Sequence, residues 1–201
     1  MRSWVILSIL LSGCTSFSPL LIPTSKPPSA STSETIQVIV KPIATQGMGS
    51  DDEKQWGFEI SAYFSAFEVA VQNNTKEEIR FAPAQSYLLV GATEKFQALK
   101  EDAAIRYYKA GDDPSRFVLI PKSKKRVEEE IKHIKAAWLT GGSILPNQQK
   151  KGLILFKKVK HDQCDRVTLN LEGITLAASG MRKPFSFSFS CKEEERRPNR
   201  L

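Results

Sequence analysis

The sequence predicts a mainly β protein, an antiparallel β-sandwich interrupted by a helical insertion at about residues 100–140. Short runs of alternating apolar and polar residues, separated by Gly, Pro and Asn turn signals, are typical of antiparallel strands. In the middle of the 201-residue chain the period changes. Val127, Ile131, Ile134 and Trp138 recur at spacings of four, three and four, which is one stripe of a helix.

The chain begins with the layout of a secretory signal peptide. Arg2 is followed by an apolar run over 4–11, which is shorter than the roughly 20 residues of a membrane span. Leu11-Ser12-Gly13-Cys14 resembles a bacterial lipobox, in which the signal is cut just before the cysteine and acyl chains are attached to it. The resemblance implies a signal peptide over 1–13 and a lipid anchor at Cys14. An ordinary secretory signal with a chance cysteine is the alternative.

The residues after Cys14 predict how and where the protein is held. Two or more acyl chains hold a protein durably on a bilayer, since each buried methylene contributes about 0.8 kcal/mol. Thr15 is not the aspartate that, in enterobacterial lipoproteins, signals retention at the inner membrane. The resemblance therefore implies an outer-membrane location facing the periplasm if the organism has two membranes. Residues 14–35, rich in Ser, Thr and Pro, predict a flexible tether that holds the folded part off the bilayer.

Charge and cysteines limit the partners. The net charge of +7 fits contact with anionic lipid or wall polymer, and it equally fits solubility alone; nucleic acid is excluded for an exported protein. With Cys14 assigned to lipid, Cys164 and Cys191 are an even pair in an oxidising compartment, where a disulfide is expected. A hairpin turning near 179–180 would bring them together and close a loop of roughly 28 residues, worth roughly 3 kcal/mol. A metal site that adds His161 fits no zinc spacing.

The first half of the folded part predicts strands. Residues 36–40 alternate and form the first strand, and 46–55 is a Gly- and Asp-rich loop. The extended segment 58–71 changes the parity of its apolar residues, which predicts either a bulge near 65–66 or two strands with a sharp bend. Asn73-Asn74-Thr75 is a turn that matches a glycosylation sequon, expected to be bare in a bacterial lipoprotein. Further short strands are expected at 79–81, 86–90 and 96–99.

Two helices form the insertion. The first covers 101–110 and ends at Gly111, and the second runs from about Ser123 to Leu139. A cluster of cations crowds the start of the second helix, where the macrodipole disfavours positive charge. Its members, as a candidate contact for anionic headgroups or wall polymers, are Lys122, Lys124, Lys125 and Arg126. The simpler interpretation is a solvated helix end.

Strands return after Pro146. The unbroken apolar run at 151–156 predicts a central strand, and 167–171 alternates before Gly173, which predicts a second bulge. Residues 185–189 place three phenyl rings on one face and serines on the other. The charged tail 192–201 is expected to fray.

The strand pattern from Phe67 onward is similar to the immunoglobulin-like sandwiches of small bacterial lipoproteins. The matching features are 67–75, the Pro-bounded strand after it, 151–156 and the closing pair of alternating strands. The resemblance implies one sandwich domain over 36–191 with the helices inserted at 100–140. Such domains mostly serve as binding or assembly modules, which is an analogy from fold.

No catalytic constellation stands out. His133 points off the apolar stripe of its helix, and His161 could form a nucleophile pair with Cys164 only if that thiol were free. Glu128, Glu129 and Glu130 face different ways on one helix. We therefore expect a non-catalytic, membrane-anchored module that binds another envelope component, with no cofactor and no small-molecule substrate. A lipid- or wall-binding module and an uncharacterised hydrolase are the alternatives.

Overall fold

Antiparallel strands dominate the computed structural model, which describes residues 20–23, 29–33, 36–43, 51–58, 60–110, 123–159 and 166–192. All pairs between the named strands are antiparallel, as predicted. The strands are β1 (Leu20–Pro23), β2 (Ser29–Ser33), β3 (Ile36–Ile43), β4 (Phe64–Asn73), β5 (Ile79–Phe81), β6 (Tyr87–Val90), β7 (Glu94–Gln97), β8 (Gly142–Ile144), β9 (Gln149–Lys157), β10 (Arg166–Leu171), β11 (Ile174–Leu176) and β12 (Phe185–Lys192). The helices are α1 (Asp51–Trp56), α2 (Ile60–Tyr63), α3 (Glu101–Ala110) and α4 (Lys124–Ala137), with a 3-10 turn at Pro83–Gln85.

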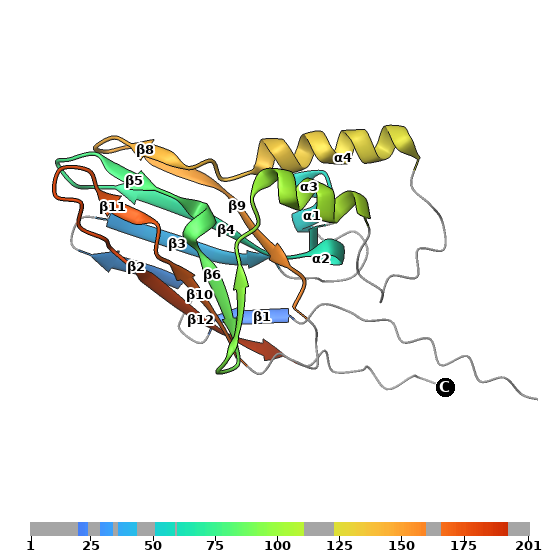
Figure 1. Ribbon diagram of the computed structural model, residues 1–201, viewed down its shortest axis with the longest axis horizontal. Helices are drawn as coiled ribbons and strands as arrows, with labels where there is room; N and C mark the ends of the chain where they lie inside the picture. Colours follow the sequence, from blue (N-terminus) through green and yellow to red (C-terminus); the bar gives the residue numbers. More distant parts are fainter. Residues whose placement is uncertain are drawn as a thin grey trace, which may run out of the picture.

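The described strands form three sheets. A five-stranded sheet has the order β1-β12-β10-β6-β7, a four-stranded sheet the order β2-β3-β4-β9, and a short three-stranded sheet the order β11-β5-β8. Figure 1 shows β12 and β10 crossing below β3 and β4, with β8, β5 and β11 gathered at one end. The mainly antiparallel β fold is therefore confirmed.

One apolar core joins the sheets. Phe67 of β4 contacts Phe156 of β9, with ring centroids 6.0 Å apart, and Phe189 of β12, with centroids 5.2 Å apart. The second contact crosses from the four-stranded to the five-stranded sheet. The predicted inward rings Phe185, Phe187 and Phe189 are all buried in this core. The alternation in β12 is therefore the signature of one buried face, as its sequence predicts.

The helices form a second cluster on the other face of β4 and β9. Ile134 of α4, Tyr108 of α3 and Ile60 of α2 are buried together with Phe64 and Leu155. Figure 1 shows α1 to α4 grouped at one end of the four-stranded sheet. The two predicted helices are confirmed, with α3 at the predicted bounds and Ser123 as the N-cap of α4. No helix in the described part of the chain is long and apolar enough to cross a membrane.

Helices α1 and α2 correct two expectations. The end of the predicted loop at 46–55 is helical, and Gly57 ends this helix at φ +75°. The predicted bulge near 65–66 is wrong. Strand β4 is paired continuously with β3 and β9, and its apolar parity changes because both of its faces are buried. Phe67, Val69 and Val71 face the core between the sheets, whereas Phe64 and Ala66 face the helices.

The run at 151–156 is an edge strand of its sheet, where we expected a central one. Strand β9 closes the four-stranded order, and it is apolar throughout because sheet and helices cover its two faces. Its outer edge is covered by irregular chain. Leu99 N donates to Leu155 O (2.8 Å) and Leu139 N donates to Leu153 O (3.1 Å).

Gly173 marks a corner, where we expected a bulge. Strand β10 ends at Leu171 in the five-stranded sheet, and β11 begins at Ile174 in the three-stranded one. A Cβ on Gly173 would lie 2.2 Å from Ala82 O, and Ala82 N donates to Gly173 O at 2.9 Å. The glycine therefore permits the close approach that turns the chain between sheets.

The flexible tether expected over 14–35 is partly structured. Leu20–Pro23 pairs with β12, and Ser29–Ser33 pairs with β3. These segments carry too little apolar patterning to reveal a strand, and main-chain pairing to an adjacent edge orders them. Strands therefore occur among the described residues from Leu20 onward, well before the predicted start at residue 36.

Candidate functional site

Several predicted site residues lie outside the described residues, namely Cys14, Lys122, His161 and Cys164. The predicted pairing of the strand that follows residue 164 with the strand that carries Cys191 is confirmed, with Arg166 opposite Ser190. Cys191 lies one residue further along β12, opposite Leu21 of β1. The disulfide between Cys164 and Cys191 stays a prediction.

The predicted basic segment is only partly available to a partner. Lys124 and Lys125 are exposed in the first turn of α4. Arg126 Nε lies 2.9 Å from Glu130 Oε1, and the side chain of Glu130 is only 6% exposed. Tyr108 Oη donates to the other oxygen of Glu130. Arg126 and Glu130 therefore help to join α4 to α3.

The histidines and carboxylates do not converge on a reaction centre. His133 is exposed on α4, and its ring packs so closely on Gly57 that a Cβ there would lie 2.7 Å from Nδ1. Glu128 and Glu129 are exposed, and Glu130 faces α3. Within the described ranges, no group of three or more His, Cys, Asp and Glu side chains could hold a metal ion.

The surface is hollowed where the chain passes from the five-stranded sheet to the four-stranded sheet. Strand β7 ends at Gln97, and the next two residues bond to different strands. Ala98 N donates to Ser86 O (2.9 Å), and Leu99 N donates to Leu155 O (2.8 Å). This crossing joins the edge of the five-stranded sheet to the edge of β9, and it leads directly into α3.

An open groove of about 530 Å³ follows the crossing, and we call it the seam groove. Phe96 and Leu99 are half-buried and Ala98 is buried, so its floor is apolar. Three lysines contribute to its walls, and all three are exposed. The full lining is Lys95, Phe96, Gln97, Ala98, Leu99, Lys100, Ala103 and Lys157. The groove therefore combines an apolar floor with a basic rim.

The lysines differ in what they already contact. Lys95 Nζ lies 3.7 Å from the centroid of the Tyr87 ring, a cation–π contact on the outer face of the sheet. Tyr87 Oη donates to Glu172 at 3.1 Å. The pKa of Tyr87 is raised, first by partial loss of hydration and then by the hydrogen bond and charge of Glu172. Lys100 and Lys157 have no ion pair within the described residues.

A smaller, more apolar hollow of about 230 Å³ shares Leu99 and Lys100 with the seam groove, and we call it the anchor pocket. Its walls come from the turn after β5, the start of α3 and the segment after α4. Trp138 is half-buried in this wall and forms an isolated bridge with Leu153. The lining is Ala82, Pro83, Ala84, Leu99, Lys100, Glu101, Trp138, Leu139, Gly141, Leu153 and Ile154.

Among the described strands, β7 has one edge without a neighbouring strand, and this edge lies beside the seam groove. It is the last strand of the five-stranded order, and its inner neighbour is β6. Because main-chain groups alternate in an antiparallel pair and Ala98 N bonds to β6, the groups of Lys95 and Gln97 point away from β6. The side chain of Gln97 turns back to Ala84 O (2.7 Å) and Ser86 O (3.1 Å). Within the described residues, this edge therefore offers main-chain donors and acceptors that have no partner.

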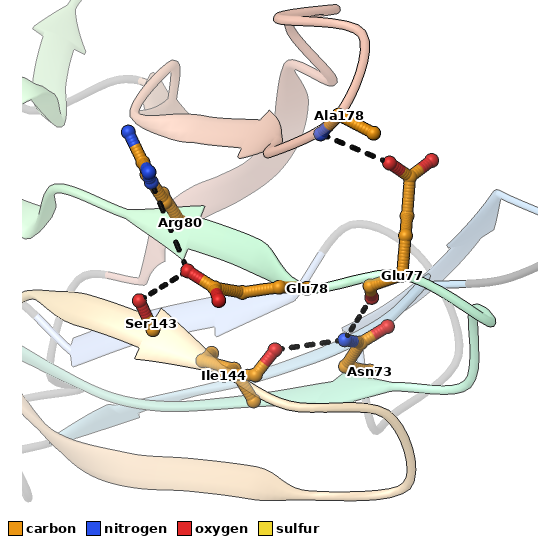
Figure 2. Close-up of polar contacts among 7 residues, drawn as sticks. All are labelled: Asn73, Glu77, Glu78, Arg80, Ser143, Ile144 and Ala178. Atoms are coloured by element: carbon orange, nitrogen blue, oxygen red, sulfur yellow. Dashed lines mark hydrogen bonds and ion pairs between the residues drawn. The ribbon is translucent and has the colours of Figure 1, made fainter.

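A polar network closes the end of the molecule away from the helices (Figure 2). Asn73 is fully buried, and its Nδ2 donates to Glu77 O and Ile144 O, both at 2.8 Å. Thr75 N donates to Asn73 Oδ1 at 2.9 Å. Glu77 accepts from Ala178 N (3.1 Å), so the network joins three turns. The sequon asparagine is therefore a structural side chain whose amide is already used.

Reasoning from sequence missed the seam groove and the anchor pocket. Their residues come from β7, α3, the end of α4 and β9, and no local period connects these segments. The one available signal was the placement of Lys95 and Lys100 on either side of a short apolar strand.

Comparison with known proteins adds little. No family model and no curated protein matches the chain. A candidate lipoprotein of Bacillus subtilis subsp. subtilis str. 168 is 17% identical at a TM-score of 0.45, over 84% of this chain and 40% of its own. A functionally unknown protein of Listeria monocytogenes EGD-e is 16% identical at a TM-score of 0.41, over 90% of this chain and 92% of its own. The chain thus spans two fifths of the first protein's length. Both TM-scores are low, so neither similarity carries an argument about fold or function.

Proposed function

We propose that this chain is an exported, non-catalytic binding module, acylated at Cys14, whose seam groove receives an extended acidic segment of another envelope protein. The envelope location rests on the lipobox-like Leu11–Cys14, and the side of attachment is the outer membrane facing the periplasm if the organism has two membranes. The domain is immunoglobulin-like in its paired sheets, with the helices as an insertion.

The observation that carries the binding role is the free edge of β7 beside an apolar groove with a basic rim. An extended peptide can add to such an edge as a further strand, through main-chain hydrogen bonds that do not depend on sequence. Phe96 and Leu99 would bury its apolar side chains. Lys100 and Lys157, which lack ion pairs in the described part, would attract carboxylates.

The anchor pocket indicates how the segment is held in register. Its volume of about 230 Å³ lies below the roughly 300–1,000 Å³ of pockets that bind drug-sized ligands. It suits one large aliphatic or aromatic side chain, packed against Trp138 and Leu139. A partner segment with acidic residues and one apolar anchor therefore fits the two adjoining hollows.

Photocrosslinking in the native cell tests this proposal. A benzoylphenylalanine at Ala103 lies in the groove wall, and the crosslinked peptide is identified by mass spectrometry. We expect one envelope protein, joined through a segment that carries several Asp or Glu residues. Binding of that segment as a synthetic peptide to the purified full-length protein is then measured by fluorescence anisotropy.

Charge reversal supplies the matched control. Exposed ion pairs are each worth about 0.2–1 kcal/mol, so K100E/K157E is expected to weaken peptide binding about tenfold. K124E/K125E makes the same charge change on exposed residues of α4 and is expected to leave binding unchanged. Binding that responds only to the second pair would contradict the proposal and favour the basic segment. Crosslinks spread over many proteins, with no single segment in common, would also contradict the proposal.

A further inference from the structure

We infer that the end of the five-stranded sheet at Leu20 faces the bilayer, so that the seam groove serves a membrane-proximal segment of its partner. The inference rests on the proposed acylation of Cys14. It starts from the pairing of β1, which brings the folded domain much closer to the anchor than a flexible tether would.

Chain length limits the distance between anchor and domain. Leu20 is paired with Lys192 at the edge of the sheet. Six peptide steps separate Cys14 from Leu20, and a fully extended chain spans at most about 3.3–3.6 Å per residue. Leu20 therefore lies within about 21 Å of an acylated cysteine, less than the length of the sheet itself.

The register identifies which residues share this end. Strand β1 starts here, β12 ends here, and β10 starts here with Arg166 opposite Ser190. Gly91 N donates to Arg166 O (2.9 Å), which places the β6–β7 turn at the same end. In Figure 1 this turn and the head of β12 lie together at the bottom, away from β5, β8 and β11. The exposed Thr93 at this turn is therefore a marker of the proximal end.

The opposite end is marked by the turn after β11. Ser179 is exposed there, beyond the start of β12 at Phe185. Eight residues of β12 alone span about 27 Å at roughly 3.4 Å per residue. If the proximal end faces the bilayer with β12 upright, Ser179 is held about that much further from the headgroups than Thr93.

One end of the seam groove, at Lys95, lies close to the proximal end. Lys95 pairs with Leu89, which pairs with Thr168, only two positions along β10 from Arg166. Lys95 is thus about 13 Å along the strand direction from the level of Leu20. Added to the reach of the anchor, this holds Lys95, at the near end of the groove, within about 35 Å of the headgroups. A partner segment close to its own membrane anchor or membrane span can reach it.

Energy transfer to labelled lipid tests the orientation. The full-length acylated protein is reconstituted in vesicles that contain a headgroup-labelled acceptor lipid, with a donor dye on p-acetylphenylalanine at residue 93 or 179. We expect strong transfer from 93 and at least threefold weaker transfer from 179. Equal transfer, or stronger transfer from 179, would overturn the inference.

A spacer variant separates orientation from anchoring. Twenty Gly and Ser residues inserted after Thr15 lengthen the reach to well over 60 Å, so transfer from 93 should fall toward that from 179. Vesicle binding, the acyl mass on Cys14 and binding of the free acidic peptide should stay unchanged. If Cys14 carries no acyl mass, the proposed anchoring fails and the inference with it. If Cys14 is acylated but the spacer changes nothing, only the inference fails.

Discussion

Replacing Gly152 by alanine is expected to loosen the wall of the anchor pocket and lower the stability of the whole domain. An added Cβ would lie 2.8 Å from Leu139 Cα, 2.9 Å from Leu139 N and 3.0 Å from Ala137 O. Carbon atoms pack at about 3.5–4.0 Å, and all three neighbours belong to the main chain. The segment that leads from α4 past Trp138 must therefore move by several tenths of an ångström or more.

The cost of Gly152→Ala has two parts. Overpacking of a close contact costs about 1–3 kcal/mol. Moving Leu139 weakens its hydrogen bond to Leu153 O (3.1 Å), worth about 0.5–1.5 kcal/mol. Together they predict a loss of about 2–4 kcal/mol in the free energy of unfolding.

Urea unfolding followed by circular dichroism measures this loss, with an unchanged dependence on urea as the sign that the folded state is otherwise intact. Gly91→Ala is the control, because nothing lies within 4 Å of its Cβ and only its φ of +60° opposes alanine. That strain costs about 1–2 kcal/mol. If Gly152→Ala costs no more than Gly91→Ala, the close approach of residues 137–139 to β9 is wrong.

Three further predictions concern polar groups. Asn73→Ala removes the side-chain partner of two buried main-chain groups, Ile144 O and Thr75 N, and one of the two partners of Glu77 O. It should cost roughly 3 kcal/mol in urea unfolding, and a loss below about 1 kcal/mol would contradict the network. The hydrogen bond from Arg106 (2.7 Å) lowers the pKa of Asp102, so Arg106→Gln should raise that pKa in an NMR titration; this pair's contribution is present above about pH 4 and is lost as acid protonates the folded carboxyl. Glu172 helps to raise the pKa of Tyr87, so Glu172→Gln should lower it toward about 10. Because the folded pKa of Tyr87 is raised, its contribution to stability is fully present below the unfolded pKa of about 10. This contribution is lost as the pH rises through the folded pKa, and tyrosine NMR signals would follow the titration.

Local patterns predicted the elements whose burial is simple. Strand β12 has one buried face, so its Phe and Ser residues alternate. Helix α4 has one apolar stripe, so its period of 3.6 is visible, and Ser123 caps it as expected. In both elements the pattern of burial repeats within a few residues. A single sequence shows such repeats without any knowledge of distant partners.

Elements with two buried faces were misinterpreted. In β4, Phe64 faces the helices and Phe67 faces the other sheet, so a change of parity looked like a bulge. In β9, the run 151–156 looked central although β9 ends its sheet. In each case burial is set by helices whose packing the strand's own sequence does not reveal.

The candidate site was the least predictable part. Lys100 and Lys157 flank one groove although 57 positions separate them. Trp138 lines the anchor pocket because Gly152 has no side chain, which lets the main chain of residues 137–139 approach β9 closely. Neither fact leaves a local signal, because both depend on strands paired across long stretches of sequence.

By itself, the sequence determined a mainly antiparallel β fold and the two helices α3 and α4, and its N-terminal motif is the basis of the proposed acylation at Cys14. Only the tertiary structure decided that Leu20–Pro23 and Ser29–Ser33 are strands, which edges are free and where the groove lies. The physical reason is the range of the interactions. Side-chain period reports burial within a few residues, whereas main-chain pairing orders even a polar segment such as Ser29–Ser33 once a neighbouring edge is in place.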